Sequence, residues 1–415
     1  MNQRAEPGRP NKAPQHDVLL AAACQIVGDG GLAALTLRSL AGELDVSVTV
    51  LTHHYGARAG VIAAICQAAA QHDARMLDGW RAMLDQEPPV PMPMGLAADL
   101  AEAILEEQAS GQRGLTVLFL EMLHACTWDA SLRPAMVDWI GVRRDFWHAF
   151  AKQAQVAPAL IACGWWHGYV IAEHAYGVVL DGMGPYRMLR RLCLQRLLGG
   201  GVAPTPDAAD ARLFAAVAQR MALPSVGQPA GASSARVPAW SVAAARVCGI
   251  RLAAQGVGGL THRAIAAEVG IPSSTLSYRY PAQRDLVLAG LESIVAHISA
   301  AVDADDLDKL QRLRTDGDGE KLDLARASLA VAIAATRMPE LAGCVADMRA
   351  RRGANLVKVF GKYLPQARGI DALAAQVVSM GLTGLTITEP PGEASDKSVA
   401  TAFAAAGRWL ATYSG

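Results

Sequence analysis

Paired cysteines, charged residues and long apolar runs are all scarce in this 415-residue chain. Its seven cysteines are odd in number, scattered and show no CxxC pair, which argues against a disulfide framework and favours free thiols in a reducing compartment. Charged residues make up 18% of the chain with a formal net charge of zero, which argues against a uniformly basic nucleic-acid binder. No apolar run approaches the roughly 20 residues that span a bilayer. The polar first 15 residues lack the apolar core of a signal peptide, so we expect a cytoplasmic protein.

The sequence motifs of common catalytic and metal sites are also missing. There is no GxSxG elbow, no phosphate-binding loop and no HExxH helix, so we expect that the protein is not an enzyme and needs no cofactor. His124 and Cys126 are two positions apart, and His167 and His174 are seven apart. Neither spacing matches the i, i+4 pair of a helical metal site, so we expect no metal.

Apolar residues, mostly alanine and leucine, make up 52% of the chain and recur with helical periodicity almost everywhere. The pattern predicts an all-α protein of two or three domains. The predicted helices include a long one at 58–84 and continuous segments at 158–180 and 340–363. Another, at 185–198, carries four arginines that could form either a surface stripe or an interface.

A 32-residue pattern occurs twice without gaps, at 31–62 and again at 256–287. The two copies are identical at nine positions, which are Gly31/Gly256, Leu35/Leu260, Thr36/Thr261, Arg38/Arg263, Ala41/Ala266, Glu43/Glu268, Leu51/Leu276, Tyr55/Tyr280 and Ala57/Ala282. Each copy predicts a helix, a tight turn and a second short helix, the outline of a helix-turn-helix DNA-binding unit. One chain with two such units could supply what a symmetric dimer normally supplies.

Local signals place the helix ends within each copy. Thr36 and Ser47 stand at N-cap positions of the two short helices in the first copy. In the second copy, Gly270 suits a left-handed turn and Pro272 a first helical position. The second copy is also the more basic one, because six arginines oppose two acidic residues between Arg236 and Leu288. We therefore expect it to contribute more of any attraction to phosphate.

The two segments LTLRSLAGELDVSVTVLTHHYGARAGV (35–61) and LTHRAIAAEVGIPSSTLSYRYPAQRDLV (260–287) resemble the TetR family of bacterial transcriptional regulators. The resemblance implies an N-terminal three-helix DNA-binding domain followed by a helical domain that binds a small ligand and dimerises. Ordinary members carry one unit per chain, whereas this chain resembles two members fused in tandem. The resemblance therefore implies an intramolecular pseudo-dimer in which helices at 158–180 and 207–221 pack against helices at 370–388 and 395–413.

The expected domain organisation follows from this reading. The predicted segments are a flexible arm at 1–15, a first helix-turn-helix domain at 16–62, a first helical domain at 63–223, a linker at 224–238 rich in Pro, Gly, Ser and Ala, a second helix-turn-helix domain at 239–287 and a second helical domain at 288–415.

Candidate DNA contacts lie on the polar faces of the short helices and at the residues that flank them. In the first copy they are Thr36, Arg38, Ser47, Thr49, Thr52, His53, His54, Tyr55 and Arg58. In the second they are Thr261, Arg263, Ser273, Ser274, Thr275, Ser277, Tyr278, Arg279, Tyr280 and Arg284. Small hydroxyl residues allow close approach to a groove, and cationic donors meet phosphates or base edges. Two alternatives stay open: solvated helix faces with no partner, and a first copy that has lost DNA binding.

An aromatic-rich region predicts where an effector would bind. Its candidate residues are Phe119, Met122, His124, Trp128, Trp139, Phe146, Trp147, Trp166, His167 and Tyr169. Apolar walls with a few polar tips suit an apolar or aromatic molecule of drug size. The alternative is that these side chains form the core or the interface of the helical bundle.

We therefore expect a cytoplasmic, ligand-responsive repressor that binds an asymmetric operator through double-stranded DNA contacts. Its recognition helices would lie about 34–36 Å apart, one turn of DNA. The alternative is a ligand-independent DNA-binding or partner-binding co-regulator in which one helix-turn-helix is degenerate. An activator is also compatible with the sequence, and two chains could pair further.

Overall fold

The computed structural model describes residues 15–85, 92–199, 209–222, 238–302, 322–363, 370–389 and 393–412. Within these ranges all regular secondary structure is helical and no strand occurs, which confirms the all-α prediction. The predicted arm at 1–15 and the predicted linker at 224–238 fall outside the described residues, except for the last residue of each. No helix in the described ranges is both long enough and apolar enough to cross a membrane.

The chain divides into two compact units that do not follow the two halves of the sequence. Unit 1 comprises residues 1–89 and 112–146, and unit 2 comprises residues 90–111 and 147–415. The chain crosses between the two units three times within 63–223, the segment predicted as the first helical domain. Part of that segment is therefore packed in the same unit as the whole second half of the chain.

Unit 1 contains five helices and the beginning of a sixth among its described residues. They are α1 (His16–Gly30), α2 (Leu37–Glu43), α3 (Val48–Tyr55), α4 (Arg58–Leu84), α6 (Arg113–Ala125) and the first part of α7 (Arg133–Gln153). Helix α1 packs against both α4 and α6. Leu19, Ala23 and Val27 line its buried face at helical spacing and are fully shielded from solvent. The three-helix cluster α1–α3 is thus built on the apolar stripe of α1.

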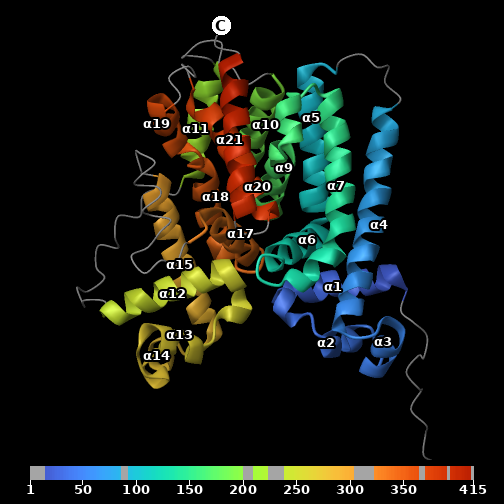
Figure 1. Cartoon of the computed structure of the whole chain (residues 1–415), viewed down its shortest axis with the longest axis vertical. Helices are drawn as coiled ribbons and strands as arrows, with labels where there is room; N and C mark the ends of the chain where they lie inside the picture. Colours follow the sequence, from blue (N-terminus) through green and yellow to red (C-terminus); the bar gives the residue numbers. More distant parts are fainter. Residues whose placement is uncertain are drawn as a thin grey trace, which may run out of the picture. The chain divides into compact units, whose positions relative to one another are not determined.

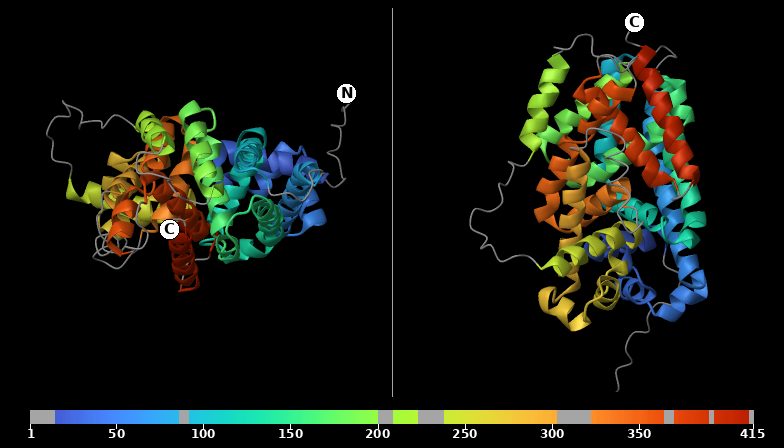
Figure 2. Two further views of the ribbon diagram at one scale, coloured as in Figure 1. Left: turned by 90° about the horizontal axis from the view of Figure 1, so that it is seen from above. Right: turned by 60° about the vertical axis from the view of Figure 1, so that its left-hand side comes forward.

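Besides the end of α7, unit 2 contains the remaining α-helices of the described residues (Figure 1, Figure 2). They are α5 (Met94–Glu106), α8 (Pro158–Ala162), α9 (Trp165–Leu180), α10 (Gly184–Leu198), α11 (Ala209–Met221), α12 (Ala239–Gln255), α13 (His262–Val269), α14 (Ser273–Arg279), α15 (Gln283–Val302), α17 (Leu324–Ala335), α18 (Ala342–Ala350), α19 (Ala354–Tyr363), α20 (Ala372–Thr388) and α21 (Glu393–Thr412). Helices α12, α13 and α14 form a second three-helix cluster, and α12 packs along α15.

Two helices that the sequence predicted as continuous are each broken by a glycine. The segment 158–180 divides into α8 and α9 at Gly164, whose φ is +77°. The segment 340–363 divides into α18 and α19, with Gly353 at a φ of +81° between them. A left-handed residue ends a right-handed helix, and glycine adopts that conformation without steric cost. The prediction of two unbroken helices was therefore wrong.

Helices α9 and α20 form a close pair within unit 2 (Figure 1). Glycines face each other where the two helices meet. A Cβ atom added at Gly384 would lie 1.7 Å from the backbone oxygen of Gly168, and one added at Gly168 would lie 2.4 Å from the backbone oxygen of Gly381. The backbones therefore touch directly, as they do where small residues line a helix crossing.

Candidate nucleic-acid interface

Helices α2 and α3 are short, and side-chain caps fix the start of each. The Thr36 hydroxyl accepts a hydrogen bond from the Ser39 amide, and the Ser39 hydroxyl accepts one from the Thr36 amide in return. Ser47 accepts a bond from the Val50 amide at the start of α3. Both predicted N-caps are confirmed. Caps matter here because helices of seven or eight residues are unstable on their own.

Helices α13 and α14 repeat this arrangement with different residues. The Thr261 hydroxyl caps α13 by accepting a bond from the Ala264 amide. Gly270 ends α13 in the left-handed conformation, with a φ of +75° and a ψ of +32°, as predicted. Its counterpart in the first copy, Asp45, also has a positive φ of +49°. Pro272 stands at the N-cap of α14 and Ser273 is the first helical residue, so the prediction of Pro272 as the first helical position was wrong by one residue.

The backbone hydrogen bonds of the two copies correspond at the same offset as the sequence repeat. Val46 donates to the Ala41 carbonyl in one copy, and Ile271 donates to the Ala266 carbonyl in the other. The bond from Gly31 to Val27 likewise has its counterpart in the bond from Gly256 to Leu252. The internal repeat is therefore present in the local fold as well as in the residues.

The side chains predicted to contact DNA are all exposed or partly exposed. Helix α14 presents Ser274, Tyr278 and Arg279 to solvent, and Tyr278 is 92% exposed. Helix α3 presents Thr49, His53 and His54 at the equivalent positions. A fully exposed tyrosine on a short helix is unusual for a residue that packs well, and such side chains mark contact surfaces. Helix α14 therefore has the stronger character of a binding surface.

Besides the capping residues Thr36, Ser47 and Thr261, other predicted contact residues also interact within the protein. The Tyr280 hydroxyl lies 2.9 Å from the Ser241 hydroxyl of α12, so its polar end contributes to the internal packing of the cluster. Arg284 forms an exposed ion pair with Glu340 at 2.7 Å. The Thr52 hydroxyl donates to the Val48 carbonyl within α3. A contact between Arg284 and phosphate would have to replace its pairing with Glu340.

The start of α4 offers a different electrostatic feature. Arg58 is the first residue of α4 and is exposed, and no side chain caps this helix. A cation at a helix N-terminus is disfavoured by about 0.3–1 kcal/mol, because the helix dipole is positive there. An anion bound at this end would instead meet both the helix dipole and the Arg58 guanidinium.

The candidate effector residues of unit 1 lie in its core. Phe119 and Trp139 pack edge to face with ring centroids 5.1 Å apart, and both are fully buried. The Trp139 indole donates to Asp73, which also accepts a 2.6 Å bond from the Arg143 Nε. Asp73 and Arg143 are shielded from solvent, and the Arg143 guanidinium stacks over the Phe119 ring. These aromatic rings therefore surround an ion pair.

The remaining members of the unit 1 set differ in exposure. Met122, His124 and Phe146 are buried, whereas Trp128 is 39% exposed. The His124 and Trp128 rings pack edge to face at 4.7 Å.

The candidate effector residues of unit 2 also pack mainly on one another. Trp166 stacks on Phe150 and on Tyr169, and its indole donates to the Trp147 carbonyl at 2.8 Å. Trp147, Trp166, His167 and Tyr169 are all buried. The ten predicted residues thus fall into two clusters, one in each compact unit.

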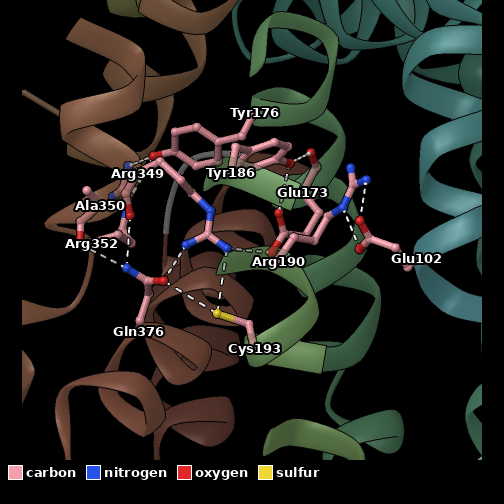
Figure 3. Close-up of polar contacts among 10 residues, drawn as sticks. All are labelled: Glu102, Glu173, Tyr176, Tyr186, Arg190, Cys193, Arg349, Ala350, Arg352 and Gln376. Atoms are coloured by element: carbon pink, nitrogen blue, oxygen red, sulfur yellow. Dashed lines mark hydrogen bonds and ion pairs between the residues drawn. The ribbon is translucent and has the colours of Figure 1, made fainter. Parts of the chain in front are cut away.

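A buried polar network that the sequence analysis did not predict joins α9, α10, α18 and α20 within unit 2 (Figure 3). Glu173 of α9 accepts a 2.7 Å bond from Arg349 of α18, and both side chains are fully shielded from solvent. Arg349 also donates to Gln376 of α20 at 2.6 Å. Burial alone would lower the pKa of Arg349, but the Glu173 carboxylate raises it, so the guanidinium stays charged.

Helix α10 extends this network to α5. The Tyr186 hydroxyl donates to Glu173, and burial raises the pKa of Tyr186 well above its usual range. Arg190 donates two 2.8 Å bonds to Glu102 and lies 2.8 Å from Asp181. Burial raises the pKa of Glu102, while the bonds from Arg190 oppose that change. Charges that are this well paired can fix which helices pack together and in which register.

No protein-family model matches this chain, and no curated protein matches its sequence.

Two signals in the sequence could have revealed the buried network. Glu173 is the only acidic residue within the otherwise apolar α9, and an acid in such a helix needs a buried partner. The arginine-rich helix α10 has two faces. Arg190 and Arg196 are buried and pair with acids of α5, α11 and the N-cap of α20, whereas Arg187 and Arg191 form exposed pairs. The helix is therefore both a surface stripe and a packing element.

Proposed function

We propose that this chain is a sequence-specific DNA-binding transcriptional regulator, most simply a repressor that a small effector releases from an asymmetric operator. The observation that carries the proposal is the duplicated three-helix cluster, with α3 and α14 as its recognition helices. The two clusters share caps, turns and backbone hydrogen bonds at the offset of the sequence repeat. Each presents hydroxyl and basic or imidazole side chains on the exposed face of its last short helix.

The side chains of α3 and α14 support unequal contributions of the two helices to DNA binding. Helix α14 has Arg279 in its last turn, and Tyr278 is exposed on the same helix. Helix α3 has His53 and His54 at the same positions and no arginine. An arginine can make a bidentate contact with guanine or a phosphate, whereas a neutral imidazole contributes less to counterion release. The two half-sites of the operator should therefore differ in sequence.

We further propose that the two halves of the chain pair with each other as a pseudo-dimer. The close packing of α9, from the first half, along α20, from the second, supports this part. The apolar or aromatic effector would bind beside the aromatic clusters of the helical regions. The aromatic side chains there are largely engaged with one another.

That same engagement favours a second candidate function. In it, the protein binds DNA or a partner without any effector, and α3 no longer recognises bases. The weaker basic character of α3 is the specific observation that favours it. An activator would bind DNA in the same way, so the binding experiment below serves both directions of regulation.

The test is selection of DNA by the purified full-length chain from a pool of random duplexes, followed by gel-shift titration at two salt concentrations. We expect an enriched sequence with two unequal half-sites and an affinity that falls as salt rises. Arg279→Ala should weaken binding by about tenfold or more, equivalent to the 1–3 kcal/mol of one good contact. His53→Ala should affect only the half-site that α3 recognises.

The matched control is Arg212→Ala, which removes the same charge from an exposed position of α11. It should leave the affinity nearly unchanged. Enrichment of one half-site only, with no effect of His53→Ala, would favour the second candidate. A folded protein that enriches no sequence would overturn the proposal that the chain recognises DNA by sequence.

A further inference from the structure

One partly buried arginine in unit 2 departs from the pattern that the fully buried arginines of the described residues follow. Each buried guanidinium contacts a carboxylate within 4.0 Å, as in Arg143 with Asp73, Arg190 with Glu102, Arg196 with Asp210, Arg326 with Asp323 and Arg349 with Glu173. Arg352, in the turn that follows α18, is partly buried. It has no carboxylate partner among the described residues. A cation that is partly withdrawn from water is normally paired with an anion, so the lack of one at Arg352 calls for a specific explanation.

The partners of Arg352 are hydroxyl groups from three different helices. Its Nε and Nη2 donate to the Tyr176 hydroxyl of α9 at 3.1 and 2.6 Å (Figure 3). Nη2 also donates to Ser328 of α17 at 2.8 Å, and Nη1 donates to Thr383 of α20 at 3.4 Å. The residues that supply these hydroxyls are buried, with Tyr176 only 3% exposed. Three separate helices thus contribute hydroxyl groups to one guanidinium.

The hydrogen-bond donors at this point outnumber the acceptors. Ser328 donates its own proton to the Leu324 carbonyl at 2.6 Å. In the described part of the chain, the hydroxyl protons of Tyr176 and Thr383 have no acceptor, because both oxygens only accept from Arg352. The second N–H of the Arg352 Nη1 also has no acceptor there. One hydrogen-bonded cluster therefore combines a positive charge with three donors that have no acceptor among the described residues.

The backbone holds Arg352 in place. Gly353, directly after it, has a φ of +81°, and a Cβ added there would lie 2.5 Å from the Ala375 carbonyl oxygen of α20. The turn is thus pressed against α20 in a conformation that favours glycine. The end of α18, just before Arg352, is also fixed to α20, because the Gln376 side chain donates to the carbonyls of Arg349 and Ala350. The donors are preorganised rather than carried on a free loop.

We propose that Arg352, Tyr176 and Thr383 form a binding site for the carboxylate group of a small organic acid. A carboxylate supplies the single negative charge and the several acceptor sites that the cluster lacks. A dianion such as phosphate fits less well, because one guanidinium balances one charge. The neighbouring Glu173, already paired with Arg349, would repel the surplus. This site differs from the apolar or aromatic site expected from the sequence, and its occupancy does not require DNA binding.

The site is tested by calorimetric titration of the full-length chain, without DNA, using acetate and benzoate as probes. Acetamide and benzamide are neutral molecules of nearly the same shape and serve as the comparison. We expect saturable binding of the carboxylates and none of the amides. Arg352→Gln should abolish binding. Tyr176→Phe, which keeps the ring and removes only the hydroxyl, should raise the Kd about tenfold, the loss typical of a charge-assisted hydrogen bond.

The matched control is Arg351→Gln, because Arg351 is the neighbouring residue, is also partly buried and pairs instead with Asp347 at 3.8 Å. Its Kd should equal that of the unmodified chain. Tyr176→Phe carries the test if Arg352→Gln does not fold. Absence of saturable carboxylate binding, equal binding of benzoate and benzamide, or binding that Arg352→Gln does not change would overturn the proposal. Phosphate or chloride binding with the same dependence on Arg352 would overturn the assignment to a carboxylate.

Failure of this titration leaves the DNA-binding proposal intact, and failure of the DNA selection leaves this site intact. If both succeed, a gel shift with added benzoate asks whether the acid is also the effector.

Discussion

Gly384→Ala should destabilise unit 2, although the same change elsewhere in a helix stabilises it. Alanine is favoured over glycine in a helix interior by about 0.8–1.0 kcal/mol. At Gly384, however, the new Cβ would lie 1.7 Å from the Gly168 carbonyl oxygen, where normal contact needs roughly twice that separation. The opposing atoms belong to backbone, so no side chain can rotate away. Helices α9 and α20 must therefore move apart.

The magnitude follows from two opposed contributions. Overpacking a tight core costs typically about 1–3 kcal/mol, and a backbone clash belongs at the upper end of that range. Subtracting the helix-propensity gain of about 1 kcal/mol leaves a net loss of about 2 kcal/mol. The separation would also weaken the contact of the Trp165 ring with Gly381, where an added Cβ would lie only 2.1 Å from the indole.

Urea unfolding followed by circular dichroism measures the effect. Gly79→Ala is the matched control, because Gly79 lies in the exposed interior of α4 with no atom within 4 Å of an added Cβ. It should stabilise the protein by about 0.8–1.0 kcal/mol. If Gly384→Ala raised the unfolding midpoint as Gly79→Ala does, the direct backbone contact between α9 and α20 would be refuted.

Three further predictions follow from features described above. Gly270→Ala should lower the free energy of unfolding, measured with urea, by about 1–2 kcal/mol. The left-handed backbone is the only obstacle to alanine there, because no atom lies within 4 Å of an added Cβ. An unchanged unfolding midpoint would contradict the left-handed conformation of Gly270. Glu173→Gln and Arg349→Met should each lower the free energy of unfolding by about 3–5 kcal/mol, because each leaves a buried partner unpaired. The double variant should lose clearly less than the sum of the two, so additive losses in a double-mutant cycle would contradict the buried pair. Burial raises the pKa of the Cys66 thiol from 9.0 to about 12, so only about one thiol in 10⁴ is ionised at pH 8 and alkylation mapped by mass spectrometry should require unfolding. The same elevated pKa means that the free energy of unfolding falls as pH rises from 9 toward 12, because the thiol of the unfolded chain ionises first. Rapid labelling of Cys66 in the native protein at pH 8 would contradict the elevated pKa.

Sequence reasoning succeeded where neighbouring residues decide the structure. Thr36, Ser47 and Gly270 act on backbone groups within a few positions, so the residue type alone indicates the cap or turn. It failed at Gly164 and Gly353, because the apolar periodicity continues across each break and hides the change of direction. The exposure of the predicted DNA contacts was foreseeable from their polarity and spacing.

Partners distant in the chain were beyond such reasoning. Arg190 is buried beside Glu102 and Asp181, which come from other parts of the chain. No local sequence pattern reveals these ion pairs. The aromatic residues between 119 and 169 looked like one cluster in the sequence. They are divided between two compact units, because the unit boundary follows Phe146 in the middle of α7.

The ion pair between Glu173 and Arg349 also has a consequence for the order in which the protein is made. The two residues are 176 positions apart, although both are buried in the same core. At a synthesis rate of about 5–20 residues per second, the acid is made about 9 to 35 seconds before its cation. Helix α9 cannot reach its final environment during that interval. The first half of unit 2 therefore stays incompletely packed until the second half has been synthesised. Slow codons between the two would lengthen the time for which its apolar surface is exposed to chaperones.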